Sequence, residues 1–204
     1  MTIRQWLEML ASGSPTPGGG AAAALSGAMA AALVEMVCRF TIGRPKYAPV
    51  QFEIEGVLRQ AALLRTSFEK LIDADVQAYS DVVAARKLPK EPPDAAAHRY
   101  RMLQSALVKA AEVPLETAKH AVEVIQLVAI ISEKGNRNLL SDVSVALTLA
   151  VSAANAAASN VRVNLPFLTN ELQRETLDRA LTSILDRVEA THAAITARLE
   201  HSPA

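Results

Sequence analysis

The sequence predicts an all-α fold, a bundle of long antiparallel helices with Ala-rich helices at its centre. Half of the 204 residues are apolar but only 4% are aromatic, and the chain holds 8 glycines. Its core must therefore be built from Ala, Leu, Val and Ile, which is typical of packed helices rather than of a sandwich or barrel. Apolar residues also recur at helical spacing over long stretches, and a strand pattern is confined to the short alternation at residues 161–163. We expect one domain, residues 1–204.

The N-terminal part is predicted to hold a short helix, a loop and an Ala-rich helix. Thr2 can cap the short helix, whose apolar residues recur at helical spacing over residues 3–10. Residues 12–20 read SGSPTPGGG and must be irregular. The Ala-rich helix follows over residues 20–41 and ends before Gly43.

Two long helices and a stiff connector occupy the middle of the chain. A regular apolar stripe predicts a helix over residues 50–87, and the proline-rich residues 88–93 interrupt it. Asp94 is positioned to cap the second long helix, which we expect to run to residue 132 with a kink at Pro114.

The C-terminal part is predicted to hold a second Ala-rich helix and a closing amphipathic helix. Gly135 suits the left-handed position just past the preceding helix, and residues 136–141 bridge to the Ala-rich helix that begins near Asp142. Residues 164–166 break that helix, and an amphipathic helix over residues 169–199 closes the fold.

Several classes of function are disfavoured. The 21 basic residues equal the 21 acidic ones, and no long basic run or aromatic platform appears, which argues against a nucleic-acid partner. The single Cys38 excludes an internal disulfide framework and a Cys-based zinc site, and the scattered histidines lack the spacing of metal ligands, so we expect no metal. The N-terminus lacks the basic-then-apolar order of a signal peptide, which predicts a cytoplasmic protein.

Two apolar segments approach the length of a membrane span. Residues 18–38 consist mainly of Ala, which contributes little transfer energy, and Glu35 interrupts them. Polar residues recur through residues 143–163. We therefore expect no membrane partner and interpret both segments as helices buried in a bundle or a subunit interface.

Asp75 is the residue that departs most from the apolar pattern. Steps of seven from Ala61 reach Phe68, Asp75 and Val82, which places a carboxylate on the apolar face of a helix. Such a carboxylate either bonds to nearby backbone, lies where the stripe widens into solvent, or has a raised pKa that suits proton transfer or a cationic substrate.

Polar or glycine-rich connectors supply the other candidate groups. Asp142 alone is an ordinary acid of a first helical turn, but the preceding connector is more polar than a turn requires. In that connector Asn138 and Ser141 compete as helix caps, and the one left over is free to bind a ligand. The three glycines of residues 18–20 allow backbone amides to approach a flat ring or an anion. Alternatively, they only let the chain enter a tightly packed bundle.

These residues together resemble the cyclodeaminase/cyclohydrolase family of folate enzymes. That family includes the cyclodeaminase half of formimidoyltransferase-cyclodeaminase and free-standing methenyltetrahydrofolate cyclohydrolases. The resemblance covers nearly the whole chain. Its marks are Pro15–Gly20 followed by alanines, Thr41–Gly43 with Lys46–Tyr47, Asp75 with Tyr79, Leu88–Lys90, Glu112–Leu115, Gly135–Asn136 with Asn138, Ser141–Asp142, and Asn160–Val161 with Asn164.

The resemblance implies an enzyme of one-carbon metabolism that acts on a tetrahydrofolate derivative as substrate and carries no cofactor. It implies a homodimer with the site near the subunit interface. Asp75 and Asp142 would act as base and electrostatic partner, in either assignment, with Lys46 orienting water or the intermediate. The substrate-binding candidates are Gly18, Gly19, Gly20, Tyr47, Tyr79, Asn138, Ser141 and Asn164, with Lys90 and Arg162 as weaker candidates for its glutamate tail.

Two functions follow from the resemblance, and a third, non-enzymatic one stays open beside them. The first is hydrolysis of 5,10-methenyltetrahydrofolate to 10-formyltetrahydrofolate. The second is cyclodeamination of 5-formimidoyltetrahydrofolate, which yields 5,10-methenyltetrahydrofolate and ammonia. The third is a non-catalytic helical dimer that binds folate. We also expect the dimer to form through residues 20–41 or 142–160, so that Leu in place of Gly27 or Ala31 would overpack the interface.

Overall fold

The computed structural model describes residues 1–200 and confirms the all-α prediction. These residues form α-helices joined by short loops and 3₁₀ turns, and no strand occurs among them. The α-helices are α1 (Ile3–Leu10), α2 (Gly19–Arg39), α3 (Gln51–Lys87), α4 (Pro93–Lys134), α5 (Leu140–Asn164) and α6 (Glu171–Glu200).

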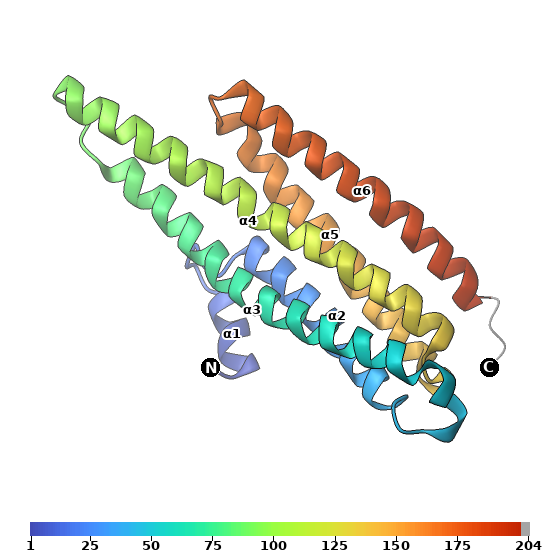
Figure 1. Ribbon diagram of the computed structural model, residues 1–204. Helices are drawn as coiled ribbons and strands as arrows, with labels where there is room; N and C mark the ends of the chain where they lie inside the picture. Colours follow the sequence, from blue (N-terminus) through green and yellow to red (C-terminus); the bar gives the residue numbers. More distant parts are fainter. Residues whose placement is uncertain (201–204) are drawn as a thin grey trace.

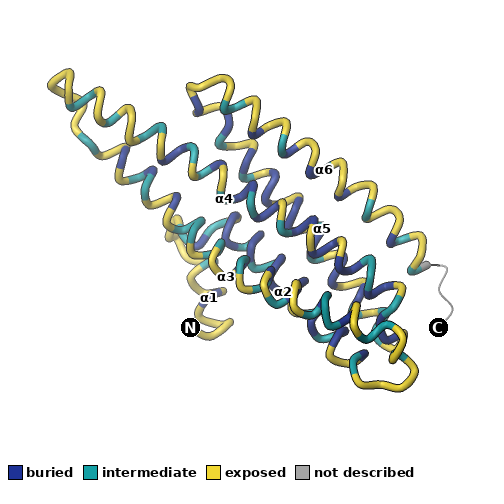
Figure 2. The backbone as a smooth tube through the Cα atoms, in the orientation of Figure 1, coloured by how far each residue is buried: buried dark blue, intermediate teal, exposed yellow. Residues whose placement is uncertain are grey.

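The five long helices lie along a common axis, and α1 stands aside from them (Figure 1). Helix α2 packs against α3 and α5, and α4 packs against α3 and α5, while α6 covers α4 and α5. Most residues of α2 and α5 that face their neighbours are buried alanines (Figure 2). Because Ala is small, the backbones approach closely, which confirms the prediction of Ala-rich central helices.

Several predicted boundaries are confirmed. Thr2 is the N-cap of α1 and forms a capping box with Gln5. Helix α3 spans Gln51–Lys87, and α5 ends at Asn164 before a proline-containing 3₁₀ turn. The last turn before the connector to α3 is closed by Gly43, whose φ of 76° favours glycine.

Two predicted helix ends are wrong. The N-cap of α4 is Pro92, with Pro93 at the first helical position, so Asp94 lies in the first turn and caps nothing. Gly135 adopts an extended conformation with φ of −76°, not the left-handed one. Close packing explains this glycine instead, since a side chain there would collide with the Ile131 carbonyl and lie 3.2 Å from Val37 Cγ1.

The residues proposed to overpack a dimer interface lie in the core of the chain itself. Ala31 is fully buried, and a side chain at Gly27 would collide with the ring of Phe68 on α3. The outward face of α2 is a different apolar stripe, which we call the α2 stripe. Its members, each partly or fully exposed, are Ala22, Leu25, Ser26, Met29, Ala32, Leu33 and Met36.

Two stretches of the described chain are long and apolar enough to cross a membrane by length and composition. They are Gly19–Arg39 and Arg137–Phe167, and 61% and 33% of their most apolar windows are buried inside the protein. Both belong to the central helix pair, so the apolar residues of each contribute to the bundle core.

Candidate active site

One cavity collects most of the predicted residues from the glycine loop, α3 and α5. It has a volume of about 310 Å³ and opens at the N-terminal end of α2. Its lining comprises Pro15, Thr16, Gly18, Gly19, Gly20, Asp75, Ala78, Tyr79, Val82, Arg86, Leu107, Ala110, Asn160, Val163, Asn164 and Phe167. The three glycines, Asp75, Tyr79 and Asn164 are therefore brought together as predicted.

Asp75 is held by the start of α2. Its Oδ2 accepts a hydrogen bond of 2.9 Å from the backbone N–H of Ala21, one of the amides that a helix leaves unpaired at its N-terminus. A side chain at Gly20 would collide with this carboxylate. The absence of a side chain at Gly20 therefore lets the Asp75 carboxylate reach the N-terminus of α2.

Burial raises the pKa of the Asp75 carboxyl, and the hydrogen bond from Ala21 opposes that rise without cancelling it. Two of the three alternatives for Asp75 therefore apply together: its carboxylate bonds to neighbouring backbone, and its pKa is raised. Because it also lines a cavity, it is suited to exchange a proton with a bound molecule or to stabilise a cation.

Arg86 lines the same cavity and was missed by the sequence analysis. A signal was present, since Asp75, Tyr79, Val82 and Arg86 follow one another at helical steps of four, three and four and so share one face of α3. The sequence analysis chose Lys90 and Arg162 for an anionic group. The structure places both outside the cavity lining, Lys90 in the α3–α4 connector and Arg162 on the exposed side of α5.

The remaining predicted residues lie at the opposite end of the bundle. Lys46 and Tyr47 follow α2, whereas Asn138, Ser141 and Asp142 precede or begin α5. From Gly20 to Arg39 helix α2 alone spans about 28 Å. Asp75 and Asp142 of one chain therefore do not flank the same reacting group.

Asn136, which is buried, organises this second end. Its backbone N–H donates to Thr41 Oγ1 at 3.0 Å, its Nδ2 donates to the Phe40 carbonyl at 3.0 Å, and its Oδ1 accepts from the backbone N–H of Asn138 at 3.1 Å. Tyr47 joins through its hydroxyl, which donates to Asn136 Oδ1 at 3.4 Å and accepts from the N–H of Arg137 at 3.2 Å. Tyr47 thus has a structural role in the chain.

The expected competition between Asn138 and Ser141 as caps does not occur. The cap of the 3₁₀ turn before α5 is Asn136, and the N-cap of α5 itself is Leu139, with no side-chain hydrogen bond. Ser141 is exposed and Asp142 is half-buried in the first turn of α5. Lys46 lies 5.6 Å from the centre of the Tyr47 ring, which orients the ammonium group.

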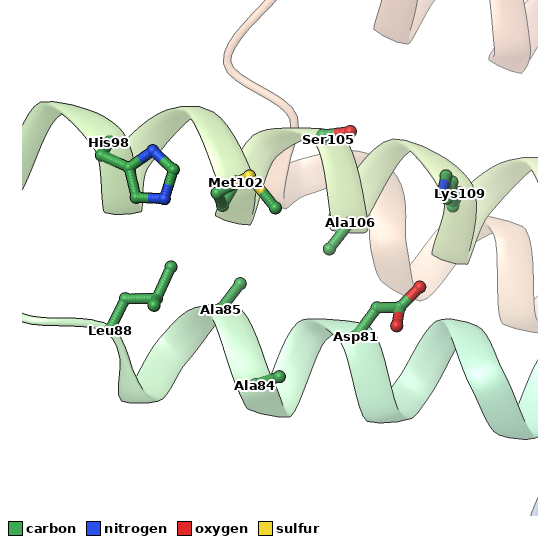
Figure 3. A pocket seen from close by; sticks show the side chains of 9 residues that line it. All are labelled: Asp81, Ala84, Ala85, Leu88, His98, Met102, Ser105, Ala106 and Lys109. Carbon is green, nitrogen blue, oxygen red and sulfur yellow. The ribbon is translucent and has the colours of Figure 1, made fainter.

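A second cavity, of about 320 Å³, lies between α3 and α4 near the end of the projecting hairpin (Figure 3). Ala85 on α3 and Ala106 on α4 point toward each other across it, and Leu88, His98 and Met102 lie toward its hairpin end. Asp81 on α3 and Lys109 on α4 also line it. It contains none of the predicted residues, so the cavity beside the glycine loop is the better candidate.

The thiol of Cys38 is buried in the bundle. Burial raises the pKa of the Cys38 thiol to about 12, so the thiol stays protonated at neutral pH. Within residues 1–200, no group of three His, Cys, Asp or Glu side chains is placed to hold a metal ion.

Comparison with known proteins agrees with the resemblance. The family model described as formiminotransferase-cyclodeaminase matches residues 2–183. The chain belongs to this family. A methenyltetrahydrofolate cyclohydrolase of Methylorubrum extorquens is 42% identical over 194 residues, which is 95% of this chain and 93% of that protein.

Other members of the family are more distant. The formimidoyltransferase-cyclodeaminase of Rattus norvegicus is 28% identical over 98% of this chain, which spans 37% of the rat protein. The crystal structure of formiminotetrahydrofolate cyclodeaminase from Thermotoga maritima superposes with a TM-score of 0.90 at 29% identity. It covers 98% of this chain and 96% of that one.

Proposed function

We propose that this protein hydrolyses 5,10-methenyltetrahydrofolate to 10-formyltetrahydrofolate. The observation that carries the proposal is the Asp75 carboxyl, which has a raised pKa and lines a cavity beside the open start of α2. The 42% identity to a methenyltetrahydrofolate cyclohydrolase over nearly the whole of both chains supports this substrate.

The chemistry needs a carboxylate and water. The bridging carbon of the substrate belongs to an amidinium cation, and the negative field of Asp75 stabilises it in the cavity. Water attacks that carbon and gives up a proton to a carboxylate acting as general base. The hydroxyl group left on the carbon then loses its proton to become the formyl oxygen, the bond from the carbon to N5 breaks, and N5 takes up a proton. The formyl group remains on N10, and one proton is released overall.

We also propose that the active form is a homodimer whose site combines both ends of the bundle. Met29 is the middle residue of α2 (Gly19–Arg39), lies on the α2 stripe and has 45% of its surface exposed. A twofold axis through this point would run the two α2 helices antiparallel. The partner subunit's Lys46 and the partner subunit's Asp142 would then approach the cavity that holds Asp75.

A charged residue introduced on the α2 stripe tests whether the dimer forms through this surface. Met29→Glu would bury a carboxylate at the axis, so sedimentation should show a monomer in place of the dimer. Leu63→Glu is the matched control, because Leu63 is 71% exposed on α3 and away from the α2 stripe. A concentration-independent monomer for the unmodified protein would overturn the dimer.

The function is tested by assaying two substrates in parallel. We expect enzyme-dependent loss of methenyltetrahydrofolate absorbance above its spontaneous hydrolysis. Ammonia release from 5-formimidoyltetrahydrofolate would instead favour cyclodeamination, the activity named for the Thermotoga maritima structure. Binding of folate without either turnover would leave a folate-binding dimer and overturn the enzyme.

A further inference from the structure

A proline inside α4 leaves one backbone carbonyl without its helical partner. Helix α4 runs unbroken through Pro114, which has no N–H to donate to the carbonyl of Ala110 four residues earlier. Asn164, the last residue of α5, supplies the missing donor. Its Nδ2 donates to the Ala110 carbonyl at 2.8 Å and to the Asn160 carbonyl at 2.9 Å.

This pair of hydrogen bonds fixes which way the Asn164 amide faces. Turning the amide over would place its oxygen against two carbonyl oxygens, which repel it. Nδ2 is therefore committed to the backbone, and Oδ1 is the polar atom that remains. Within residues 1–200, Asn164 Oδ1 accepts no hydrogen bond, and Asn164 lines the candidate cavity.

Asn160, one turn earlier on α5, repeats the arrangement. Its Nδ2 donates to the Ala156 carbonyl at 2.9 Å, and it lines the same cavity beside Gly19. The cavity thus presents two amide oxygens and the Asp75 carboxylate as acceptors, whereas Arg86 lines it as a cationic donor. The three acceptors suit the N–H donors of a ligand edge and disfavour an edge made only of oxygens.

We propose that Asn164, with Asn160 beside it, determines specificity because its Oδ1 accepts hydrogen bonds from the N–H donors of the bound ring. The inference rests on the proposed function, since the 2-amino-4-oxo pyrimidine edge of a reduced folate presents an amino group and a ring N–H side by side. The glutamate end of the same molecule carries carboxylates, which these three acceptors would repel and only Arg86 would attract. A volume of about 310 Å³ also suits a fused ring system better than the whole substrate.

The experiment must separate a ligand contact from the structural bond to Ala110. Pro114→Ala restores a backbone N–H for the Ala110 carbonyl and so removes the structural need for Asn164 at that atom. Adding Asn164→Leu to this variant should therefore cost much less thermal stability than Asn164→Leu alone. In the Pro114→Ala background, any loss of ligand affinity then reports the contact with the ligand.

Dissociation constants are measured by calorimetry for tetrahydrofolate and for its analogue with a methyl group in place of the 2-amino group. Within the Pro114→Ala background, Asn164→Leu should raise the Kd of tetrahydrofolate about 5- to 100-fold, the usual range for an unsatisfied polar group. The Kd of the methyl analogue should change far less. An unchanged Kd, or an equal change for both ligands, would overturn the inference.

Failure of the proposed function gives a different result. If the unmodified protein binds tetrahydrofolate but turns over neither substrate, the enzymatic proposal fails while the comparison of dissociation constants still decides the role of Asn164. If the unmodified protein binds no tetrahydrofolate at millimolar concentration, the ligand assignment for Asn164 is overturned as well.

Discussion

The two ends of the helical bundle differ in how they use polar side chains. At the Asn136 end, polar groups bond to one another and to backbone, and they hold two connectors together. At the Asp75 end, a carboxylate and two amide oxygens face a cavity, and only some of their bonding capacity is used inside the chain. The first end is built mainly for stability and the second for binding, although both carry the motifs of the family.

The largest effect is expected at the Asp75 carboxylate. Asp75→Asn keeps an oxygen that can accept from Ala21 but removes the charge and the base. We expect turnover of methenyltetrahydrofolate to fall by about 10² or more while the helical content persists. Steady-state kinetics with circular dichroism measures both. Near-normal turnover by the folded variant would remove Asp75 from the catalytic machinery.

At the Asn136 end, the expected effect is on stability. Asn136→Ala removes hydrogen bonds to Phe40 and Asn138 from a residue that is 4% exposed, and should cost about 2 to 3 kcal/mol of unfolding free energy. Asn138→Ala, at an exposed site, should stay within about 0.5 kcal/mol and serves as control. Urea denaturation measures both, and equal losses would contradict the contrast.

Gly20 tests whether the glycine loop serves the carboxylate. Gly20→Ala would push a methyl group into the Asp75 carboxylate and displace it from the start of α2, so we expect turnover to fall about tenfold. Gly13→Ala is the matched control, because a side chain there meets nothing within 4 Å. Equal activities of the two variants would show that the position of Asp75 is unimportant.

The smallest expected effect is that of Asp75→Asn on the free energy of unfolding and its dependence on pH. Since burial raises the pKa of Asp75 in the folded state, ionised Asp75 costs stability at pH values above that raised pKa. Asp75→Asn should therefore be slightly more stable than the unmodified protein at neutral pH. The difference should vanish in acid below the ordinary aspartate pKa, where both states are protonated. A less stable variant at neutral pH would contradict this sign.

The sequence predicted the helices well because their signals are local. The apolar stripe of α3, the alanines of α2 and α5, and the break at Asn164 each act within a few turns. Predictions failed where close packing decides: a side chain at Gly27 would collide with Phe68 on α3, and one at Gly135 would collide with the Ile131 carbonyl and approach Val37 on α2. Likewise, periodicity singled out Asp75, but only the fold shows that Arg86 shares its cavity and that Asp142 lies at the opposite end of the bundle.

We propose that one site needs residues from both ends of the bundle and hence from two subunits, and mixing two variants tests this directly. Asp75→Asn and Asp142→Asn proteins, each inactive alone, are mixed, dissociated and reassociated before turnover is measured. Half of the random dimers would be mixed, and each of these would hold one intact site. The account predicts recovery of about a quarter of the unmodified activity. No recovery, with mixed dimers demonstrated by sedimentation or mass spectrometry, would contradict the account.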